Sequence, residues 1–448
     1  MDYRSINPHT EELLQEFPTA SASEVDMALG AAAAGFRNWR QVPLRHRLEL
    51  LLRLADLLER NAAVHARLMA EEMGKPSLQG ETESRKCAAA CRHYAEHAEE
   101  YLLPTSSGRV RPEPLGPVLA IMPWNFPFWQ LFRFGAAALA AGNTIILKHA
   151  PNTPRCALRL VELFREAGAP EGVFQNLFLE NEQAAGVIAD PRVAAVTLTG
   201  STRAGRSVAA TAGAALKPVV LELGGSDPFI VFEDASMEDA VQTAIASRCV
   251  NSGQSCIAAK RFLVQRSAWD RFVGPFCEAM QNQKAGDPLD PETKIGPLAR
   301  KDLRDALRGQ VEATLARGGR ILAQASEVPT RGFYFPATVI GDIPADSPAA
   351  REELFGPAAT VIPFEDEDDA LALANDTEYG LGASLWTANA DRAQRLIPRI
   401  EAGNVFVNSM VKSEPRLPFG GTKQSGFGRE LGREGILEFT NLKTVCME

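Results

Sequence analysis

Short β-rich runs alternate with helical runs from Pro117 onward, and this alternation limits the possible folds more than any other feature of the sequence. The first four runs are PVLAI, NTIILK, VFQNLF and VAAVTLT, and segments with helical spacing of apolar residues separate them. Strands connected by helices form βαβ units and pair in parallel. A second alternating region follows Gly225, and 448 residues exceed what one hydrophobic core usually covers. The sequence therefore predicts an α/β protein with two large domains.

The first hundred residues show a different pattern. Between Ser23 and Arg60 the apolar residues recur at helical spacing, which predicts two amphipathic helices, and a third is expected from about Gly80 to Tyr101. The segment LPTSSGRVRPEPLGPV, residues 103–118, then breaks the pattern with four prolines and two glycines. This segment predicts a strand or hairpin that leaves the body of the protein.

Charge and composition argue against several classes of protein. The formal net charge is −9, and no run of Lys and Arg is present, so we expect no nucleic-acid surface. The longest apolar stretches, such as residues 134–142, fall short of the roughly 20 residues of a membrane-spanning helix. The beginning of the chain lacks the basic start and apolar run of a secretory signal, and the seven cysteines lack framework-like spacing. These features predict a cytoplasmic protein with free thiols and no membrane contact.

One cluster of residues contains potential metal ligands. Cys87, Cys91, His93 and His97 fall within eleven residues of a predicted helix. Cys87 and Cys91 share one face and the two histidines share another, so the four side chains cannot converge on one ion. We therefore expect no metal site. None of the six histidines lies in a motif that would make it the base for a thiol nucleophile.

Four short motifs carry residues suited to chemistry, three at the ends of predicted strands and one in a loop after a predicted helix. They are MPWNFPFW with Asn125, LTGSTRAGR with Gly200 and Ser201, LELGGSDP with Glu222, and NSGQSC with Cys256. Each has an ordinary structural interpretation as a cap, a turn, a solvated strand end or a loop. Each also has a functional one, because a strand-to-helix turn can hold a phosphate and a rigid amide can stabilise developing negative charge. Taken singly, the motifs do not decide between these interpretations.

Seven motifs in order resemble the aldehyde dehydrogenase superfamily over nearly the whole chain: PWNFP, LKHAPNTP, LTGST, LELGGSDP, NSGQSC, EELFGP and PFGGTKQSGFGRE. The resemblance implies a Rossmann-type cofactor domain from residues 1–95 and 117–224, and an α/β catalytic domain from residues 225–424. It also implies a small β oligomerisation element from residues 96–116 and 425–448, in a homodimer or homotetramer.

The resemblance also assigns the chemistry. Cys256 matches the nucleophile that attacks an aldehyde to form a thiohemiacetal, which becomes a thioester after hydride transfer. Asn125 and the Cys256 backbone N–H match the oxyanion hole, and Glu222 matches the general base for hydrolysis of the thioester. A free thiol is mostly protonated at neutral pH, so Cys256 needs activation.

A dinucleotide is the implied cofactor. The residues that match cofactor contacts of the family are Trp124, Lys148, Gly200, Ser201, Glu353 and Phe355. Many members that use NAD carry an acidic residue three positions after the lysine, where this chain has Pro151. The partner of the NAD 2′-hydroxyl is therefore missing, and we expect either NAD or NADP as cofactor.

Within the superfamily, the sequence is most similar to the short bacterial succinate semialdehyde dehydrogenases. This similarity implies that Arg133 and Ser413 bind the distal carboxylate of the substrate, a role that suits a guanidinium and a hydroxyl. A second arginine found in some members is replaced by Val250, and Arg248 lies two residues earlier. Other possibilities are a dehydrogenase for glutarate semialdehyde or an aliphatic aldehyde, a thiol acyltransferase or hydrolase without a redox cofactor, and a structural member of the superfamily.

Overall fold

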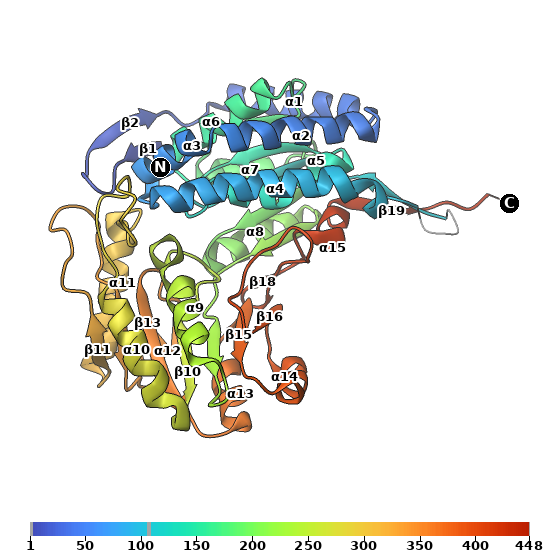
Figure 1. Ribbon diagram of the computed structural model, residues 1–448. Helices are drawn as coiled ribbons and strands as arrows, with labels where there is room; N and C mark the ends of the chain where they lie inside the picture. The colour runs from blue at the N-terminus through green and yellow to red at the C-terminus, as the bar shows by residue number, and fades with distance from the viewer. Residues whose placement is uncertain (1–2, 105–108, 448) are drawn as a thin grey trace.

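The computed structural model describes residues 3–104 and 109–447 and consists of two layered α/β halves (Figure 1). A six-stranded sheet with its helices forms the upper half in this view, and a seven-stranded sheet forms the lower half. The predicted α/β fold class is confirmed. The domain boundaries given above stay predictions.

The six-stranded sheet has the order β18-β8-β7-β4-β5-β6, and every neighbouring pair is parallel except β18 with β8. Its strands are β4 (Pro117–Ile121), β5 (Thr144–Lys148), β6 (Phe174–Asn176), β7 (Ala195–Thr199), β8 (Val219–Glu222) and β18 (Gly426–Phe427). Strands β5 and β6 follow on one side of β4, and the next strand in sequence, β7, lies on the other side of β4. In open α/β sheets ligands bind at such a switch point, at the carboxyl ends of the strands. Asn125 follows β4 and Gly200 follows β7, so both lie at this edge.

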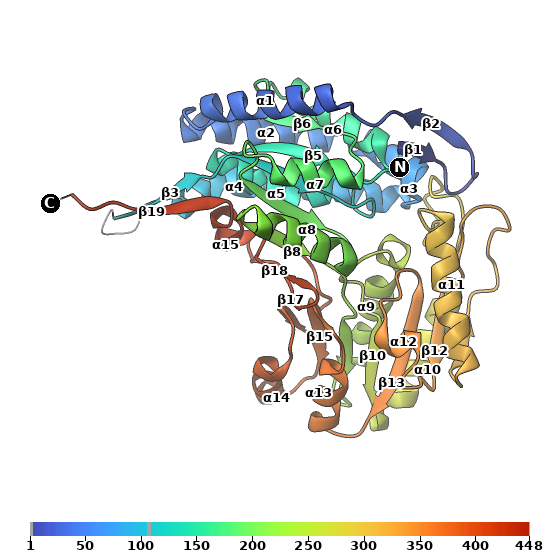
Figure 2. The same ribbon diagram turned by 180° about the vertical axis from the view of Figure 1, so that it is seen from behind.

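Two sets of helices cover this sheet. One apolar cluster joins it to α1 (Ala22–Trp39), α7 (Asn181–Ala189) and α8 (Thr202–Ala214), which face the viewer in Figure 2. A larger cluster lies on the opposite face and includes α2 (Leu44–Arg60), α4 (Ser77–Tyr101), α5 (Trp129–Ala141) and α6 (Pro154–Glu166), while α3 (Ala62–Met73) packs beside α4. All thirteen residues of α5 are buried. This helix is therefore a core element, and it directly follows the Asn125 loop.

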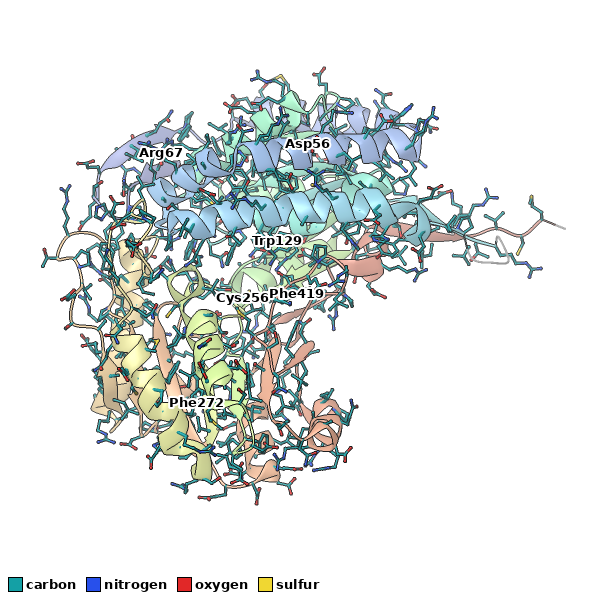
Figure 3. The ribbon with its side chains drawn as sticks, in the orientation of Figure 1. Asp56, Arg67, Trp129, Cys256, Phe272 and Phe419 are labelled. Atoms are coloured by element: carbon teal, nitrogen blue, oxygen red, sulfur yellow. The ribbon has the colours of Figure 1, made fainter. Side chains whose placement is uncertain are left out.

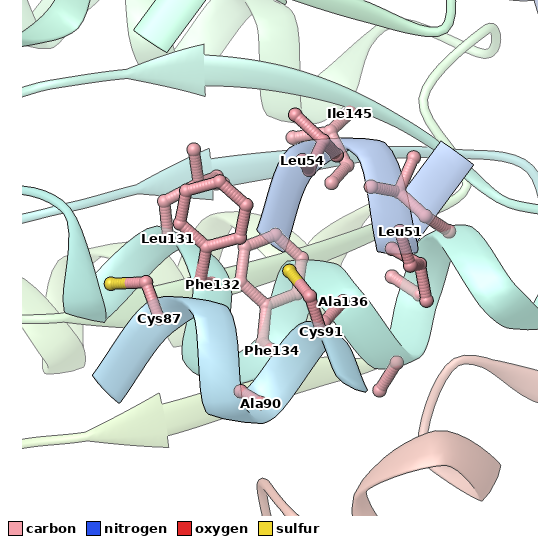
Figure 4. Close-up of a cluster of buried hydrophobic side chains, with 14 of the residues drawn as sticks. Leu51, Leu54, Cys87, Ala90, Cys91, Leu131, Phe132, Phe134, Ala136 and Ile145 are labelled. Carbon is pink, nitrogen blue, oxygen red and sulfur yellow. The ribbon is translucent and has the colours of Figure 1, made fainter. Parts of the chain in front are cut away.

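The predicted helices near the N-terminus are present, with one addition. Ser21 and Glu24 form a reciprocal capping box that starts α1, and Pro43 precedes α2. The helix α3 was not expected from the sequence. Figure 4 shows Cys87 and Cys91 of α4 among apolar side chains of α2 and α5. Both thiols are part of the hydrophobic core, and within residues 3–104 and 109–447 no group of three or more potential ligand side chains is arranged for a metal ion.

The seven-stranded sheet has the order β11-β12-β13-β10-β9-β15-β16, and only β11 runs antiparallel to its neighbour. Its strands are β9 (Pro228–Val231), β10 (Arg261–Gln265), β11 (Arg320–Gln324), β12 (Thr338–Gly341), β13 (Ala358–Phe364), β15 (Gly382–Trp386) and β16 (Asn404–Val407). The helices of this half are α9 (Met237–Cys249), α10 (Trp269–Gln281), α11 (Lys301–Ala316), α12 (Pro348–Arg351), α13 (Glu367–Asn375) and α14 (Ala390–Leu396). Helices α9 and α10 pack on one face, and α13 and α14 on the other.

A two-stranded ribbon projects from the body (Figure 2). It pairs β3 (Val110–Pro114) antiparallel with β19 (Thr440–Thr444), which follows α15 (Gly432–Leu437). Residues 105–108 of the expected excursion lie outside the described residues, and its described part contains the strand β3, which pairs with β19. Two smaller pairs are β1 (Tyr3–Ile6) with β2 (Leu13–Phe17) and β14 (Tyr379–Gly380) with β17 (Thr422–Lys423). No helix in the described part of the chain is long and apolar enough to cross a membrane.

Candidate active site

The Cys256 loop begins with an unusual turn at the end of α9. Asn251, Ser252 and Gly253 have φ values of 52°, 56° and 76°, so three consecutive residues adopt the left-handed conformation. A Cβ atom at Gly253 would lie 2.3 Å from the backbone of Gly356, so only glycine fits there. Such strain persists only where the surroundings hold it in place. The turn carries the chain from α9 to Cys256 at the junction of the two halves, where Figure 3 places Cys256 near Trp129 and Phe419.

Two buried cations hold the carbonyl groups of this loop. Arg248 donates from Nη2 to the Gly253 oxygen at 2.6 Å and from Nη1 to the Ala259 oxygen at 2.9 Å. Lys260 donates from Nζ to the Ser255 oxygen at 2.8 Å and to the Cys256 oxygen at 2.6 Å. The guanidinium of Arg248 therefore supports the loop. It is not oriented as a replacement for the arginine that some relatives carry in place of Val250.

Asn125 is fixed against the same loop. Its Nδ2 donates to the Gln254 oxygen at 3.1 Å, and that oxygen also accepts from Asn251 Nδ2 at 3.1 Å. Asn251 Nδ2 lies 2.8 Å from the Asn125 backbone oxygen, which ties the end of β4 to the Cys256 loop. An amide nitrogen has two donors, so one N–H of Asn125 remains for another acceptor. A buried amide held in this way is pre-organised to stabilise an oxyanion.

Glu222 ends β8 as a buried carboxylate. Neither of its oxygens accepts a hydrogen bond from any described residue. Its nearest cation is Arg133, whose Nη2 lies 3.8 Å from Glu222 Oε2. Burial raises the pKa of Glu222 well above its usual range, and Arg133 offsets only part of that shift. A carboxyl group with a raised pKa and no hydrogen-bond partner is suited to accept a proton.

The Cys256 thiol is strongly affected by its surroundings. Burial raises its pKa to about 12, although the cations Arg133 and Lys260 act in the opposite direction. The thiol is therefore protonated at neutral pH in the protein described here. Attack by sulfur requires that a base take its proton, because the thiolate is the nucleophile.

A cavity of about 230 Å³ opens on Cys256 from the first half. Seven of the residues predicted for the site line it: Trp124, Asn125, Gly200, Ser201, Cys256, Glu353 and Phe355. Trp124 and Phe355 meet edge to face with ring centroids 5.8 Å apart, across the junction of the halves. Glu353 Oε1 accepts from the Gly225 N–H at 3.1 Å and lies 3.3 Å from Lys260 Nζ. Lys260 thus links the nucleophile loop to Glu353.

A second cavity of about 420 Å³ extends from Ser201 along α8 to Lys148. Ser201 belongs to both cavities and is the N-cap of α8, where its side chain accepts from the Ala204 N–H at 3.3 Å. Burial lowers the pKa of Lys148 to about 8, and no carboxylate of a described residue lies within 4.0 Å of its nitrogen. Lys148 and Arg203 line this cavity, and no Asp or Glu of the described chain does so. The pair of cavities forms a cleft with a helix N-terminus at its middle, which suits a dinucleotide with anionic phosphates.

A third cavity of about 420 Å³ lies on the other side of Cys256. Ser255 and Ile257, the two neighbours of Cys256, line it together with Phe126, which follows Asn125. Cys256 itself lines the cleft described above, and its two neighbours line this third cavity. Lys86 and Trp129 also line it, and their side chains donate to the buried Ser413 Oγ at 2.8 and 3.2 Å.

Arg133 is oriented differently from the expectation based on resemblance. Its guanidinium is buried and donates to the Glu430 carboxylate and, at 3.0 Å, to Thr199 Oγ1. It does not line the third cavity. Two buried carboxylates attract it toward the strand ends of β7 and β8, so this geometry gives no support to a contact between Arg133 and a substrate carboxylate.

Three site residues were not found from the sequence. Lys86 lies far along the chain from Ser413, and no local motif marks it. Glu430 ends the motif PFGGTKQSGFGRE, but nothing in the sequence indicates that it pairs with Arg133. Lys260 carried a weak signal, because it is a cation four residues after Cys256 in a segment that also includes Arg261. Its role depends on backbone oxygens that a sequence pattern does not reveal.

Comparisons with known proteins find similarity over nearly the whole chain. The model of the aldehyde dehydrogenase family matches residues 1–445. A protein of Synechocystis named as a probable succinate-semialdehyde dehydrogenase (NADP(+)) is 48% identical over 451 residues, which cover 99% of each chain. A succinate semialdehyde dehydrogenase (NAD(P)+) of Escherichia coli is 45% identical, with 98% of this chain and 97% of that protein covered. The crystal structure of succinic semialdehyde dehydrogenase from Streptococcus pyogenes in complex with NADP+ has a TM-score of 0.96 at 36% identity and covers 99% of both chains.

Proposed function

This chain belongs to the aldehyde dehydrogenase family, and on that premise we propose that it oxidises succinate semialdehyde to succinate with NADP or NAD. The observation that carries the proposal is that Cys256 lines one compartment while its neighbours Ser255 and Ile257 line another. One compartment leads to a cleft suited to a dinucleotide. The other is an apolar cavity with lysines in its wall, which suits a short aldehyde that carries a negative charge.

The side chains around Cys256 support a mechanism with two proton transfers. The thiol proton passes through water to solvent, which leaves Glu222 unprotonated, and the sulfur adds to the aldehyde carbon to give a thiohemiacetal. The oxygen of this adduct receives hydrogen bonds from the free N–H of Asn125 and from the Cys256 backbone N–H. Removing one such donor typically lowers the rate by about 100- to 1,000-fold.

The bound cofactor supplies the acceptor for the hydride that leaves the thiohemiacetal carbon. Loss of this hydride leaves a thioester on Cys256. Glu222 accepts a proton from water as the water oxygen adds to the thioester carbonyl, the carbon–sulfur bond breaks, and the carboxylate product leaves. The sulfur then regains its proton. Glu353 and Phe355, with Trp124, border the region next to Cys256 where the cofactor has to react.

We propose that NADP is the preferred cofactor. Lys148 and Arg203 supply positive charge in the cavity that ends the cleft, and no acidic side chain of the described residues opposes a 2′-phosphate there. The names of the Synechocystis relative and of the Streptococcus pyogenes structure refer to NADP as well.

Steady-state kinetics test this function. The purified protein is assayed with succinate semialdehyde and with butanal, an uncharged aldehyde of the same carbon number, each with NADP and with NAD. We expect kcat/KM for succinate semialdehyde to exceed that for butanal by at least about tenfold, or about 1.4 kcal/mol. Equal values for the two aldehydes would show that the carboxylate is not recognised. Absence of NAD(P)H formation with either aldehyde would favour the redox-independent thiol enzyme.

We also propose that the ribbon of β3 and β19 joins copies of the chain into a homodimer or homotetramer. The ribbon projects from the body, and Leu442 on it is 53% exposed. Exposed strand edges tend to pair. Light scattering coupled to size-exclusion chromatography measures the mass, and a monomer at micromolar concentration would contradict the proposal. A cytoplasmic location stays a prediction.

A further inference from the structure

The third cavity has an excess of positive charge that the proposed reaction does not yet explain. Three lysines line its mostly apolar wall, namely Lys86, Lys294 and Lys412, and the only carboxylate of a described residue in that wall belongs to Glu83. Lys294 and Lys412 are exposed to solvent, and Lys412 lies 4.0 Å from Glu414. Lys86 is different, because its half-buried ammonium belongs to the interior of the cavity.

The carboxylate of Glu83 is already occupied. One of its oxygens forms a buried ion pair with Lys75. The other accepts hydrogen bonds from the backbone N–H groups of Phe128 and Trp129, at 2.9 and 3.0 Å. These contacts anchor the start of α5. Glu83 therefore cannot also serve as the direct counter-ion of Lys86.

Lys86 has a polar and an aromatic neighbour but no carboxylate partner. Its Nζ donates to Ser413 Oγ at 2.8 Å and lies 4.2 Å from the ring centroid of Trp129. Within residues 3–104 and 109–447, no carboxylate oxygen lies within 4.0 Å of this nitrogen. Burial lowers the pKa of Lys86 to about 8, because the charged form has lost solvent without gaining a counter-ion.

Lys86 and Ser413 have unused N–H and O–H donors at this position. An ammonium has three N–H donors, and Ser413 uses one of those of Lys86. Ser413 Oγ accepts from both Lys86 and Trp129, so its own O–H is directed away from these two donors. A carboxylate is the ligand whose two oxygens match an ammonium N–H and a hydroxyl O–H, and it would restore the charge balance that burial has disturbed.

We propose that Lys86, together with the Ser413 hydroxyl, binds the distal carboxylate of the substrate and is the residue that selects carboxylated aldehydes. This inference rests on the function proposed above. It assigns to Lys86 the selecting charge that the resemblance placed on Arg133. Trp129 positions both groups, because its ring lies beside the ammonium and its Nε1 holds Ser413.

Kinetics of substitutions at Lys86 test the assignment. Lys86→Met keeps the length of the side chain and removes the charge, and Lys86→Arg keeps the charge. Hydrogen bonds to charged groups contribute about 1.5–3 kcal/mol, so Lys86→Met is expected to lower kcat/KM for succinate semialdehyde by about 10- to 100-fold, mainly through KM. The loss with butanal is expected to be at least tenfold smaller. Lys86→Arg is expected to restore part of the preference.

Inhibition by the product gives a second readout that is independent of turnover of the charged aldehyde. Succinate is expected to inhibit butanal oxidation by the wild-type enzyme competitively, and Lys86→Met is expected to weaken this inhibition by about tenfold or more. Lys412→Met is the comparison variant, since Lys412 lines the same cavity but is exposed. Its loss of kcat/KM for succinate semialdehyde is expected to be at least about fivefold smaller than that of Lys86→Met, because solvent screens an exposed charge.

The outcomes separate this inference from the proposed function. A wild-type enzyme that does not prefer succinate semialdehyde over butanal contradicts the function itself. If the wild type prefers succinate semialdehyde but Lys86→Met and Lys86→Gln lose kcat/KM equally for both aldehydes, the role of Lys86 is contradicted. The role is also contradicted if Lys412→Met loses kcat/KM for succinate semialdehyde as selectively as Lys86→Met does. Melting temperatures of all variants are compared, and Lys86→Gln, which retains a donor to Ser413, is used where Lys86→Met does not fold.

Discussion

The guanidinium of Arg133 lies 3.8 Å from the carboxylate of Glu222, close enough to attract it but too far to hydrogen-bond it. The same guanidinium donates directly to Glu430 and Thr199. Glu222 is thus left buried beside a cation that is engaged elsewhere. Burial keeps the pKa of Glu222 high, Arg133 offsets this only in part, and the oxygens of Glu222 stay available for a proton from water.

Glu222→Gln should separate the two halves of the reaction. The amide cannot accept a proton, so hydrolysis of the thioester is expected to slow by at least about 100-fold. Rapid mixing with NADP and succinate semialdehyde is then expected to show at most one equivalent of NADPH per site, followed by slow turnover. Loss of the first equivalent as well would indicate that Glu222 is also required to deprotonate the thiol. Turnover at the wild-type rate would contradict its assignment as the base.

The pH dependence follows from the same carboxyl group. Burial raises the pKa of Glu222, and only its deprotonated form accepts a proton. The rate of thioester hydrolysis is therefore expected to fall as the pH decreases through this raised pKa, at a higher pH than for an ordinary glutamate. The profile of kcat against pH in wild type measures the fall. Glu222→Gln is expected to lack this acid limb.

Substitution of Arg133 tests the two roles that sequence and structure suggest for it. Arg133→Met removes the partner of the buried Glu430, which is expected to destabilise the fold by about 3–5 kcal/mol and to lower kcat/KM for succinate semialdehyde and butanal alike. Arg133→Lys retains the charge and is expected to be milder. Thermal unfolding and kinetics with both aldehydes are measured. A selective increase in KM for succinate semialdehyde would instead support the carboxylate-binding role expected from the resemblance.

Cys256→Ala is expected to abolish aldehyde oxidation, because no thiohemiacetal can form without the sulfur. Binding of NADP is expected to be retained, since the cofactor cleft reaches Cys256 only at one end. Isothermal titration calorimetry measures the binding, and Cys277→Ala provides a control at a partly buried thiol on α10. Residual oxidation near the wild-type rate would disprove the assignment of the nucleophile.

Lys260→Met is expected to lower kcat by about 100-fold, because a displacement of about 1 Å at the reacting atoms has an effect of this size. Lys260 holds the carbonyl groups of Ser255 and Cys256 and lies 3.3 Å from Glu353. Its loss is therefore expected also to raise KM for NADP. Lys301→Met, on the exposed start of α11, is the control. Unchanged kcat and KM in Lys260→Met would show that the loop holds its position without this lysine.

Pro151→Glu is expected to shift the cofactor preference toward NAD. A carboxylate three residues after Lys148 can accept a hydrogen bond from the 2′-hydroxyl of NAD and repels the 2′-phosphate of NADP. The ratio of kcat/KM for NADP to that for NAD is expected to fall by about tenfold or more, or about 1.4 kcal/mol. Pro151→Gln has similar size without the charge and is expected to change the ratio less. An unchanged ratio in both variants would show that selectivity is set elsewhere in the cavity.

Much of the site could be expected from the sequence because its parts are local. Asn125 and Gly200 follow a strand and Glu222 ends one, and nearby prolines and glycines mark the turns. The order of the motifs then implied that Cys256 meets them. The sequence did not predict the helix α3, and it did not indicate which strand pairs with β3. The structure pairs β3 with β19, far along the chain.

The sequence by itself determined the α/β class, because the class depends on periodicity and on turns within a few residues. The resemblance of its ordered motifs gave the dinucleotide cofactor and the prediction that Cys256 is the nucleophile. Only the tertiary structure decided which cations serve which anions. Lys86 meets Ser413 across 327 positions of sequence, and Arg133 meets Glu430 across 297. A buried charged side chain turns toward the nearest group of opposite charge that lacks another partner. Which group is nearest depends on how the helices pack on the sheets. For this reason Arg133 turned toward Glu430 and Glu222, and Lys86 was left without a counter-ion in the third cavity.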